Sequence, residues 1–383
     1  MAAKKKAKQA PIENATFENL GDLIGDLTNT GTNAADVKGY IHTGSRGLDW
    51  ALTNGSFRGG YPQGRMIELY GGAAAGKTSA ATHALISCQR GSGVAVDWVE
   101  TDGVVRPVPS DRELQPGLAI LIDSEAKFDI QRATQMGLDA AKLHRIQGNT
   151  DKPLTVESMI ETLTSILDRV AKMEDFTSGR RPVVIVVDSI SAAATEDEFE
   201  GNALAGGIAS KPRMVRAALR KMTRRFADLN VTAFFVSHVG ANIGSVGTTP
   251  TGSGKAIGYF ASLRFNLKKG YKGSQNLDIH EAGKQVGITT QFNCTKSSVS
   301  VPFVEPINVP NVWLSGFSEQ WEVLRFLKDN KNDVLSQSGA WIKVQMPDGT
   351  DVSKYEKDLI AAMREDKELS DHLLAEFDKL NKA

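Results

Sequence analysis

The sequence predicts an α/β fold built around a mostly parallel central sheet, and three observations predict it. From about residue 64, short β-rich runs alternate with segments of helical period, a pattern typical of parallel strands covered by helices. The run at residues 183–187 is apolar at every position, as expected for a central strand buried on both faces. A glycine-rich segment at residues 71–76 lies between a predicted strand and a predicted helix, as in a strand–loop–helix unit.

Composition indicates an ordinary globular protein. The chain has 383 residues, of which 41% are hydrophobic and 23% charged, enough for a sizeable core and for about two domains. The 45 Lys and Arg balance the 45 Asp and Glu, so any contact with nucleic acid must come from local basic clusters. Two cysteines exclude a disulfide framework. No apolar run reaches the roughly 20 residues of a membrane span, and no signal sequence is recognisable, so we expect a cytoplasmic protein without a membrane partner.

Three segments of different character follow one another. We expect residues 1–15 to be a basic, flexible tail or an arm that binds phosphate. A short helix with one apolar stripe is expected next, before a linker; the stripe consists of Phe17, Leu20, Leu23, Ile24 and Leu27. The stripe could be buried on the chain's own core or on a neighbouring subunit, and we favour the neighbour. We expect domain limits at residues 1–40, 41–310 and 311–383, the last a small α/β domain.

Within the predicted core, strands are expected at residues 65–70, 118–123, 183–188 and 232–237, and a helix at residues 79–90. Residues 97–115 indicate an inserted hairpin or loop. In the C-terminal segment, residues 319–328 and 352–380 have helical period, around a short strand at residues 341–345 and a turn at residues 347–349.

The strongest functional signal is the pattern G-x-x-x-x-G-K-[ST] at residues 71–78, directly after a strand and at the start of a helix. Glycines let the backbone wrap around a phosphate, Lys77 neutralises β- and γ-phosphate oxygens, and the Thr78 hydroxyl reaches Mg²⁺. A chance match is improbable in this context. The expected nucleotide-binding residues of this segment are Gly71, Gly72, Ala73, Ala74, Ala75, Gly76, Lys77, Thr78 and Ser79.

Polar residues follow three of the predicted strands. Asp188 ends one strand, where a carboxylate can reach Mg²⁺ or its water, and Asp123 and Glu125 follow another. Glu125 could polarise the water that attacks the γ-phosphate, or it could be a solvated loop acid. His238, after a further strand, either senses the γ-phosphate or is an ordinary loop histidine, and spacing favours neither.

A basic helix follows Asp188. Arg213, Arg216, Arg220 and Arg224 recur at i, i+3, i+7 and i+11, which places four guanidinium groups on one face. Such a row is either a phosphate-binding surface or a solvated helix face. Two segments rich in glycine and small residues, 201–209 and 241–258, lie on either side of this helix, and loops of that length near a nucleotide site are often functional.

Taken in order, these features resemble the RecA family of homologous-recombination ATPases. The similarity runs from about His42 almost to the C-terminus, with further matches at residues 42–49, 200–222, 259–264 and 339–341. It implies a RecA-type P-loop ATPase core with a mostly parallel sheet, a short N-terminal helix or strand and a small C-terminal α/β domain. Its cofactors would be ATP and Mg²⁺, and its ATPase activity would depend on DNA.

The resemblance also implies roles for single residues. Glu125 would be the catalytic base, Asp123 and Asp188 would join Thr78 on the Mg²⁺ side, and Asp129 and Arg132 would lie near adenine. Residues 200–211 would form a first DNA-binding loop and residues 239–258 a second one, with Ile208 and Ile243 as apolar wedges between bases. The implied DNA-binding residues are Gly201, Ile208, Lys211, Arg213, Arg220, Lys221, Ile243, Gly252 and Gly254.

Several positions depart from the bacterial pattern. His238 replaces the glutamine that couples the γ-phosphate to the second loop, and a histidine there resembles phage UvsX-type recombinases. The lysine that reaches ATP across the subunit interface is replaced by Gly258, with Lys255 and Lys296 as possible substitutes. Residues 97–115 are not part of the usual pattern. These departures suggest a phage-encoded or divergent bacterial member, acting in a bacterial or phage-infected host cytoplasm.

The implied function is strand exchange between single-stranded DNA and a homologous duplex, on a helical filament of self-associated subunits. Loader or mediator proteins and a single-stranded-DNA-binding protein are expected accessory partners. Two alternatives stay open. One is an ATP-gated mediator that coats single-stranded DNA without exchanging strands, and the other is a hexameric helicase with a RecA fold.

Overall fold

The computed structural model describes most of the chain from residue 36 onward. The basic tail and the apolar stripe at residues 17–27 lie outside the described residues. Residues from Val37 to the C-terminus form one unit by their contacts, and within its described part no helix is long and apolar enough to cross a membrane. The described residues are 36–149, 151–190, 192–201, 210–241, 248–250, 253–272, 275–276, 278–281, 283–303 and 305–382.

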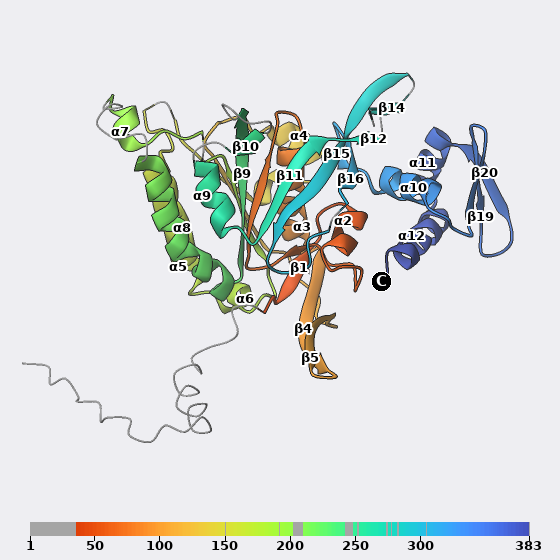
Figure 1. The fold of residues 1–383 in the computed structure, drawn as a ribbon, viewed down its shortest axis with the longest axis horizontal. Helices are drawn as coiled ribbons and strands as arrows, with labels where there is room; N and C mark the ends of the chain where they lie inside the picture. The colour runs from red at the N-terminus through yellow and green to blue at the C-terminus, as the bar shows by residue number, and fades with distance from the viewer. Residues whose placement is uncertain are drawn as a thin grey trace, which may run out of the picture. The chain divides into compact units, whose positions relative to one another are not determined.

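A large, mostly parallel sheet forms the core, as the alternation of strands and helices predicts (Figure 1). In spatial order its strands are β17 (Gly316–Phe317), β16 (Ile307–Val312), β15 (Lys284–Ser297), β11 (Leu263–Lys269), β3 (Met66–Gly71), β9 (Val231–Ala241), β8 (Val183–Asp188), β6 (Leu118–Asp123) and β7 (Leu143–Gln147). The strands from β11 to β7 run parallel, and the strands from β15 to β17 extend the sheet in antiparallel fashion. The α/β fold with a mostly parallel sheet is therefore confirmed.

Both faces of β8 are covered, which explains its uninterrupted apolar run. Val184 and Val186 belong to an apolar cluster that includes helix α3 (Lys77–Arg90). Val183, Ile185 and Val187 belong to a second cluster, with helices α5 (Val156–Val170) and α8 (Ser210–Asp228). Full burial stabilises the fold by about 1.5–3 kcal/mol for each such side chain. The sheet is thereby held between two helical layers, and its strand ends have fixed positions.

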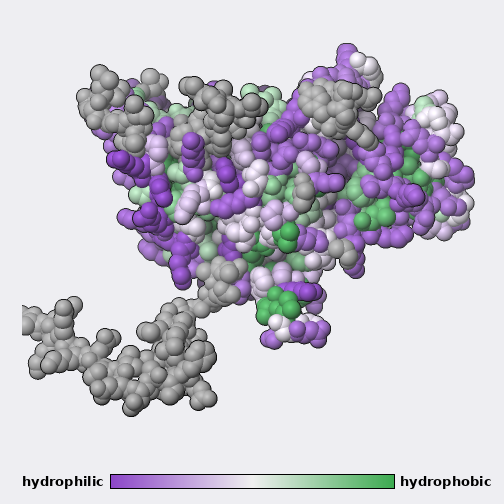
Figure 2. Space-filling model, in the orientation of Figure 1, coloured by the Kyte–Doolittle hydropathy of each residue, from purple (hydrophilic) through white to green (hydrophobic). Residues whose placement is uncertain are grey.

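The insertion predicted at residues 97–115 is largely a hairpin. Strand β4 (Gly93–Thr101) pairs antiparallel with β5 (Val104–Pro109), and both belong to a small sheet with β1 (Gly39–Ile41) and β2 (Tyr61–Pro62). Asp102 and Gly103 connect the two strands, both with positive φ, as a two-residue hairpin turn requires. The hairpin is labelled β4 and β5 in Figure 1, and apolar residues gather on it in Figure 2.

The C-terminal segment packs around its own apolar cluster. The helices predicted here are α10 (Glu319–Asp329), α11 (Glu356–Glu365) and α12 (Lys367–Asn381). A three-stranded sheet joins them, made of β18 (Leu335–Ser338), β19 (Trp341–Gln345) and β20 (Asp351–Tyr355). The helical prediction for residues 352–355 was wrong, because these residues alternate in exposure and pair with β19 from Trp341↔Tyr355 onward.

A polar contact joins this segment to helix α2 (Arg46–Ala51). Arg46 binds Asp378 of α12 through Nε at 2.6 Å and Glu319 of α10 through Nη1 at 2.9 Å. The buried Glu322 carboxylate accepts hydrogen bonds from the Ser45 hydroxyl (2.5 Å) and from the Arg46 backbone N–H (2.9 Å). Burial raises the pKa of Glu322 to about 7. The central sheet continues to Phe317 in this region, and the domain limits at residues 40 and 310 stay predictions.

The strands predicted at residues 118–123, 183–188 and 341–345 have the predicted limits, and the limits of the other predicted strands and helices differ from the structure by at most four residues. Strand β3 begins at Met66, α3 begins at Lys77, and β9 extends to Ala241. The remaining elements are α4 (Ile130–Gln135), η1 (Ala140–Lys142), α6 (Glu174–Thr177), α7 (Glu196–Phe199), α9 (Ser253–Phe260), β10 (Thr248–Pro250), β12 (Tyr271–Lys272), β13 (Gln275–Asn276) and β14 (Ile279–Glu281).

Candidate active site

The phosphate-loop sequence forms the connection between β3 and α3. Two of its glycines are required by their surroundings. Gly71 has φ +152°, and a Cβ atom there would lie 2.1 Å from the Leu267 carbonyl oxygen. Gly76 has φ +97°, and a Cβ atom there would lie 2.2 Å from the Thr290 hydroxyl. The loop therefore passes close to β11 and β15 and ends at the N-terminus of α3, where backbone N–H groups favour an anion.

Lys77 is buried against this loop. Its Nζ donates hydrogen bonds to the carbonyl oxygens of Gly71 (2.9 Å) and Gly72 (2.7 Å). Burial lowers the pKa of Lys77, although the carboxylates of Asp188 and Glu125 oppose that shift. The ammonium group is thus held at the loop, near Glu125, the predicted catalytic base, and Asp188, a predicted Mg²⁺ ligand.

A cavity of about 180 Å³ lies beside the loop. Arg132 forms one wall, with Nη2 3.0 Å from the Ser79 hydroxyl and Nε 2.6 Å from the Trp313 carbonyl oxygen. Asp129 is the N-cap residue of α4, and its side chain accepts a hydrogen bond from the Arg132 N–H at 3.0 Å. The cavity is lined by Ala74, Ala75, Gly76, Lys77, Thr78, Ser79, Arg132, Ile288, Asn311 and Trp313. The predicted adenine neighbours thus lie at or next to the cavity.

Sequence reasoning missed three of these lining residues, Ile288, Asn311 and Trp313. They come from β15, β16 and the residue after β16, which lie more than 200 positions from the loop in the chain. The Trp313 side chain is 44% exposed. No local pattern in the sequence marks these residues, because they reach the loop only through the pairing of β15 and β16.

The carboxyl ends of β6 and β8 place two aspartates side by side. Asp123 pairs with Asp188 in the register of the two strands. The buried Asp123 carboxylate accepts hydrogen bonds through Oδ2 from Arg145 (2.7 Å), Gln147 (3.0 Å) and the Phe128 N–H (3.2 Å). Asp123 therefore lies at the predicted edge, but its carboxylate is bound by two residues of β7 and by one residue of the loop that follows β6. Arg145 and Gln147 were not predicted.

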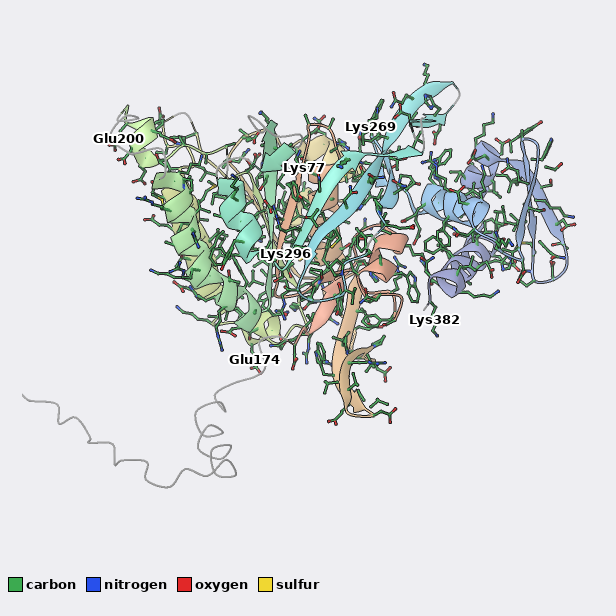
Figure 3. All side chains as sticks on the ribbon, in the orientation of Figure 1. Lys77, Glu174, Glu200, Lys269, Lys296 and Lys382 are labelled. Atoms are coloured by element: carbon green, nitrogen blue, oxygen red, sulfur yellow. The ribbon has the colours of Figure 1, made fainter. Side chains whose placement is uncertain are left out.

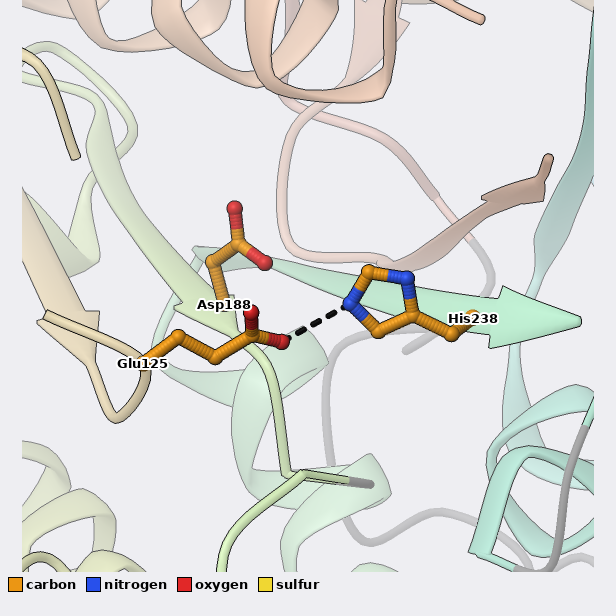
Figure 4. Close-up of side chains that lie close together, drawn as sticks. All are labelled: Glu125, Asp188 and His238. Atoms are coloured by element: carbon orange, nitrogen blue, oxygen red, sulfur yellow. Dashed lines mark hydrogen bonds and ion pairs between the residues drawn. The ribbon is translucent and has the colours of Figure 1, made fainter. Parts of the chain in front are cut away.

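Glu125, Asp188 and His238 come together at this edge (Figure 4). One ligand atom from each residue lies within 4.8 Å of the other two. His238 Nε2 is 2.8 Å from Glu125 Oε1, and Lys127 Nζ is 2.9 Å from Glu125 Oε2. The three side chains come from β8, β9 and the segment that follows β6, so the sequence-predicted convergence at one sheet edge is what the structure contains.

The electrostatics of Asp188 and Glu125 differ. Burial, with the Glu125 charge next in size, raises the pKa of Asp188 to about 6. Burial also raises the pKa of Glu125, but hydrogen bonds from Lys127 and His238 outweigh it and leave that pKa below its ordinary value. At neutral pH both groups are therefore ionised, and Glu125 is the better stabilised anion.

These residues fit a phosphate-bound Mg²⁺. Thr78 Oγ1 lies 3.4 Å from Asp188 Oδ2, so two oxygen ligands face the same space at the N-terminus of α3. Mg²⁺ prefers oxygen ligands and is usually held by one or two protein groups together with substrate phosphates. The peptide bond between Asp188 and Ser189 is cis.

The predicted arginine row lies on helix α8. Arg213, Arg216, Arg220 and Arg224 are exposed, while Val215, Leu219, Met222 and Phe226 are buried on the opposite side. Hydrophilic residues gather over α8 in Figure 2. Arg216 lies over the Tyr259 ring at 5.5 Å, and Arg224 pairs with Asp228 at 3.2 Å. Lys221 is exposed as well.

Other predicted DNA-binding residues lie elsewhere. Lys211, at the start of α8, donates a hydrogen bond to the Ala193 carbonyl oxygen, and burial lowers its pKa. Gly201 is exposed with φ +83° after α7, and Gly254 belongs to α9. Ile208, Ile243 and Gly252 lie outside the described residues.

The two lysines predicted to act across a subunit interface lie around α9. Lys255 is exposed on this helix. Lys296 Nζ on β15 donates to the carbonyl oxygens of Tyr259 (2.8 Å) and Gly258 (3.3 Å). Burial lowers the pKa of Lys296, and the nearby Arg264 charge adds to that effect. Lys77 and Lys296 lie apart in Figure 3, so this chain does not bring Lys296 into its own phosphate loop.

This fold and site define an α/β nucleotide-binding protein of the phosphate-loop class. A model of the RecA N-terminal domain matches residues 23–112 and 107–317. The chain therefore belongs to the RecA family. At the level of that family, ATP and DNA binding in recombination and repair are supported.

Curated relatives agree with this assignment. The protein RecA of Helicobacter hepaticus is 27% identical over 360 residues, which are 92% of this chain and 87% of the relative. The protein RecA of Helicobacter pylori strain P12 is 27% identical over 356 residues, covering 91% and 86%. The protein RecA of Porphyromonas gingivalis is 28% identical over 321 residues, covering 83% and 78%.

Proposed function

We propose that this protein is an ATP-dependent recombinase that forms a helical filament on single-stranded DNA and exchanges it with a homologous duplex. The observation that carries the proposal is the hydrogen bond between His238 and Glu125. It joins the candidate catalytic carboxylate to β9, and β9 leads directly into the predicted second DNA-binding segment at residues 239–258. A change at the phosphate end of the site can therefore reach that segment through one strand.

Each residue of the site has a chemical task in this proposal. The phosphate-loop N–H groups and Lys77 would bind the β- and γ-phosphates. Thr78 and Asp188 would hold Mg²⁺, which would neutralise phosphate charge. Glu125 accepts the proton of the attacking water. Its lowered pKa keeps it ionised and ready to act as a base at neutral pH.

His238 is the proposed switch. Its Nε2 contacts Glu125 Oε1 at 2.8 Å. The imidazole N–H is the donor, and a γ-phosphate would compete with Glu125 to accept its hydrogen bond. Glu125 would then be free to act on the attacking water, and the end of β9 would shift. Order in the following segment would then depend on ATP, as in other switches that the γ-phosphate controls.

DNA binding is assigned to α8 and the segments on either side of it. Arg213, Arg220 and Lys221 are exposed on one helix and suit phosphate contacts. Gly201, Ile208 and Lys211 would belong to the first loop, and Ile243, Gly252 and Gly254 to the second one. The two isoleucines would separate bases, which phosphate contacts alone cannot do.

Self-association would place one subunit's ATP against its neighbour. Lys255 and Lys296 both lie around α9, and either ammonium group could complete the site of an adjacent subunit. Packing of the stripe at residues 17–27 on the next subunit would be a heterologous contact, which continues as a helix when it does not close.

Electron microscopy on long single-stranded DNA tests this assembly. Wild type with ATP should form regular helical filaments, and Lys77→Ala should not. Closed rings under the same conditions would favour the hexameric helicase. Irregular coating that does not depend on ATP would contradict both the recombinase and the ATP-gated mediator.

A further inference from the structure

The group formed by Glu125, Asp188 and His238 has the composition and spacing of a metal site. Each residue offers one ligand atom, and these atoms lie within 4.8 Å of one another. Ligands bound at about 2.0–2.2 Å from a common ion lie roughly 3–4 Å apart, so small side-chain rotations suffice to close the group around an ion. Among the residues that the structure describes, no other three His, Cys, Asp or Glu side chains are close enough to do this.

The positions of the three ligands are well defined by the sheet. Asp188 ends β8, and His238 lies on β9 beside β3. Glu125 follows β6, where the Ser189 hydroxyl donates to its Oε1 at 3.3 Å. The Thr78 hydroxyl donates a hydrogen bond to Asp188 Oδ2 at 3.4 Å. Contacts of this kind orient the first ligands of a metal before it binds.

The donor set differs from that of a magnesium site. Mg²⁺ takes oxygen ligands, and Thr78 with Asp188 already provides them at the phosphate loop. An imidazole nitrogen together with two carboxylates suits a borderline ion such as Zn²⁺, which binds His nitrogen and Asp or Glu oxygen in a nearly tetrahedral arrangement. His238 is therefore the residue that shifts the metal preference of this edge of the sheet from Mg²⁺ toward Zn²⁺.

We propose that Glu125, Asp188 and His238 bind one Zn²⁺-type transition-metal ion in the absence of nucleotide. The functional consequence rests on the function proposed above. An ion held there would occupy the base Glu125 and the γ-phosphate contact His238 together, and it would keep the site from hydrolysing ATP until the ion leaves. The site would thus make the enzyme sensitive to free transition metal.

The proposal is tested by measuring Zn²⁺ binding to the full chain. The protein competes with a chromophoric chelator in excess Mg²⁺, without nucleotide or DNA. Wild type should bind one Zn²⁺ per chain. His238→Gln should weaken binding by at least about 10–100-fold, because it removes a ligand, whose loss costs no less than that of an outer-shell partner. His144→Gln, an exposed histidine on β7, should bind like wild type.

Two further variants keep the test decisive. Asp188→Asn should also lose binding, and Lys172→Ala, which changes an exposed lysine outside the site, should retain it. Equal Zn²⁺ affinity of His238→Gln and wild type, or no stoichiometric binding by wild type, would overturn the inference. Co²⁺ substitution gives an independent readout, because its visible absorption should show a coordinated imidazole in wild type and not in His238→Gln. Metal binding without recombinase activity would leave this inference standing and refute only the proposed function.

Discussion

Replacing Asp188 with Asn should stabilise the protein while disabling its nucleotide site. Burial and the Glu125 charge raise the pKa of Asp188 from 3.8 to about 6 in the folded state. At pH 8 the carboxyl is ionised in both the folded and the unfolded chain, and its ionisation costs the folded state about 3 kcal/mol, at 1.36 kcal/mol for each pKa unit. A neutral Asn avoids that cost.

The pH dependence has a definite sign. Because the folded pKa lies above the unfolded one, the folded chain binds a proton at Asp188 as pH falls through 6 while the unfolded chain stays ionised to about pH 4. The wild-type cost therefore shrinks as pH falls. The advantage of Asp188→Asn should be about 3 kcal/mol at pH 8, about half of that at pH 5, and small near pH 4.

Urea unfolding in EDTA, without nucleotide, measures this difference in the free energy of unfolding at several pH values. Asp123→Asn is the matched control, because Asp123 pairs with Asp188 in the sheet but is bound by Arg145 and Gln147. That variant should be destabilised by about 1.5–3 kcal/mol, since it removes the charged acceptor from the part-buried contact with Arg145. An Asp188→Asn variant that is no more stable than wild type at pH 8 would refute the reasoning.

Three further predictions concern the nucleotide and DNA. Lys77→Ala should lose nucleotide binding, measured with a fluorescent ATP analogue, and with it ATP-dependent DNA binding. Lys172→Ala, which changes an exposed lysine outside the site, is the control. Normal nucleotide affinity in Lys77→Ala would contradict the phosphate-loop assignment. Glu125→Gln should slow ATP turnover by about 10²–10⁴-fold with nucleotide affinity retained, and unchanged turnover would remove Glu125 as the base. Arg213→Ala and Arg220→Ala should each lower the slope of log affinity for single-stranded DNA against log salt by about 0.7, and a slope equal to wild type would show that these residues do not touch phosphate.

The phosphate loop and the carboxylate edge could be predicted because local rules fix them. A strand, a glycine-rich turn and a helix that begins with Lys77 and Thr78 occupy one short stretch of chain. Parallel strands end at the same edge of a sheet, so the residues that follow β6, β8 and β9 had to converge once the strands were recognised.

Other features depend on pairings that spacing does not reveal. Trp313 reaches the cavity because β16 joins the sheet through β15, an antiparallel extension with no periodic signal toward residues 71–78. Asp123 was expected near Mg²⁺, but Arg145 from β7 binds its carboxylate. Residues 351–355 became a strand because β19 offers a pairing edge, which overrides a local helical pattern.

The central claim is best tested by strand exchange between labelled single-stranded DNA and a homologous duplex, with a heterologous duplex and an ATP-free reaction as controls. The account predicts exchange with the homologous duplex alone, and only when ATP is present. Tight DNA binding and ATP turnover without any exchange would contradict it and would favour the mediator or the helicase.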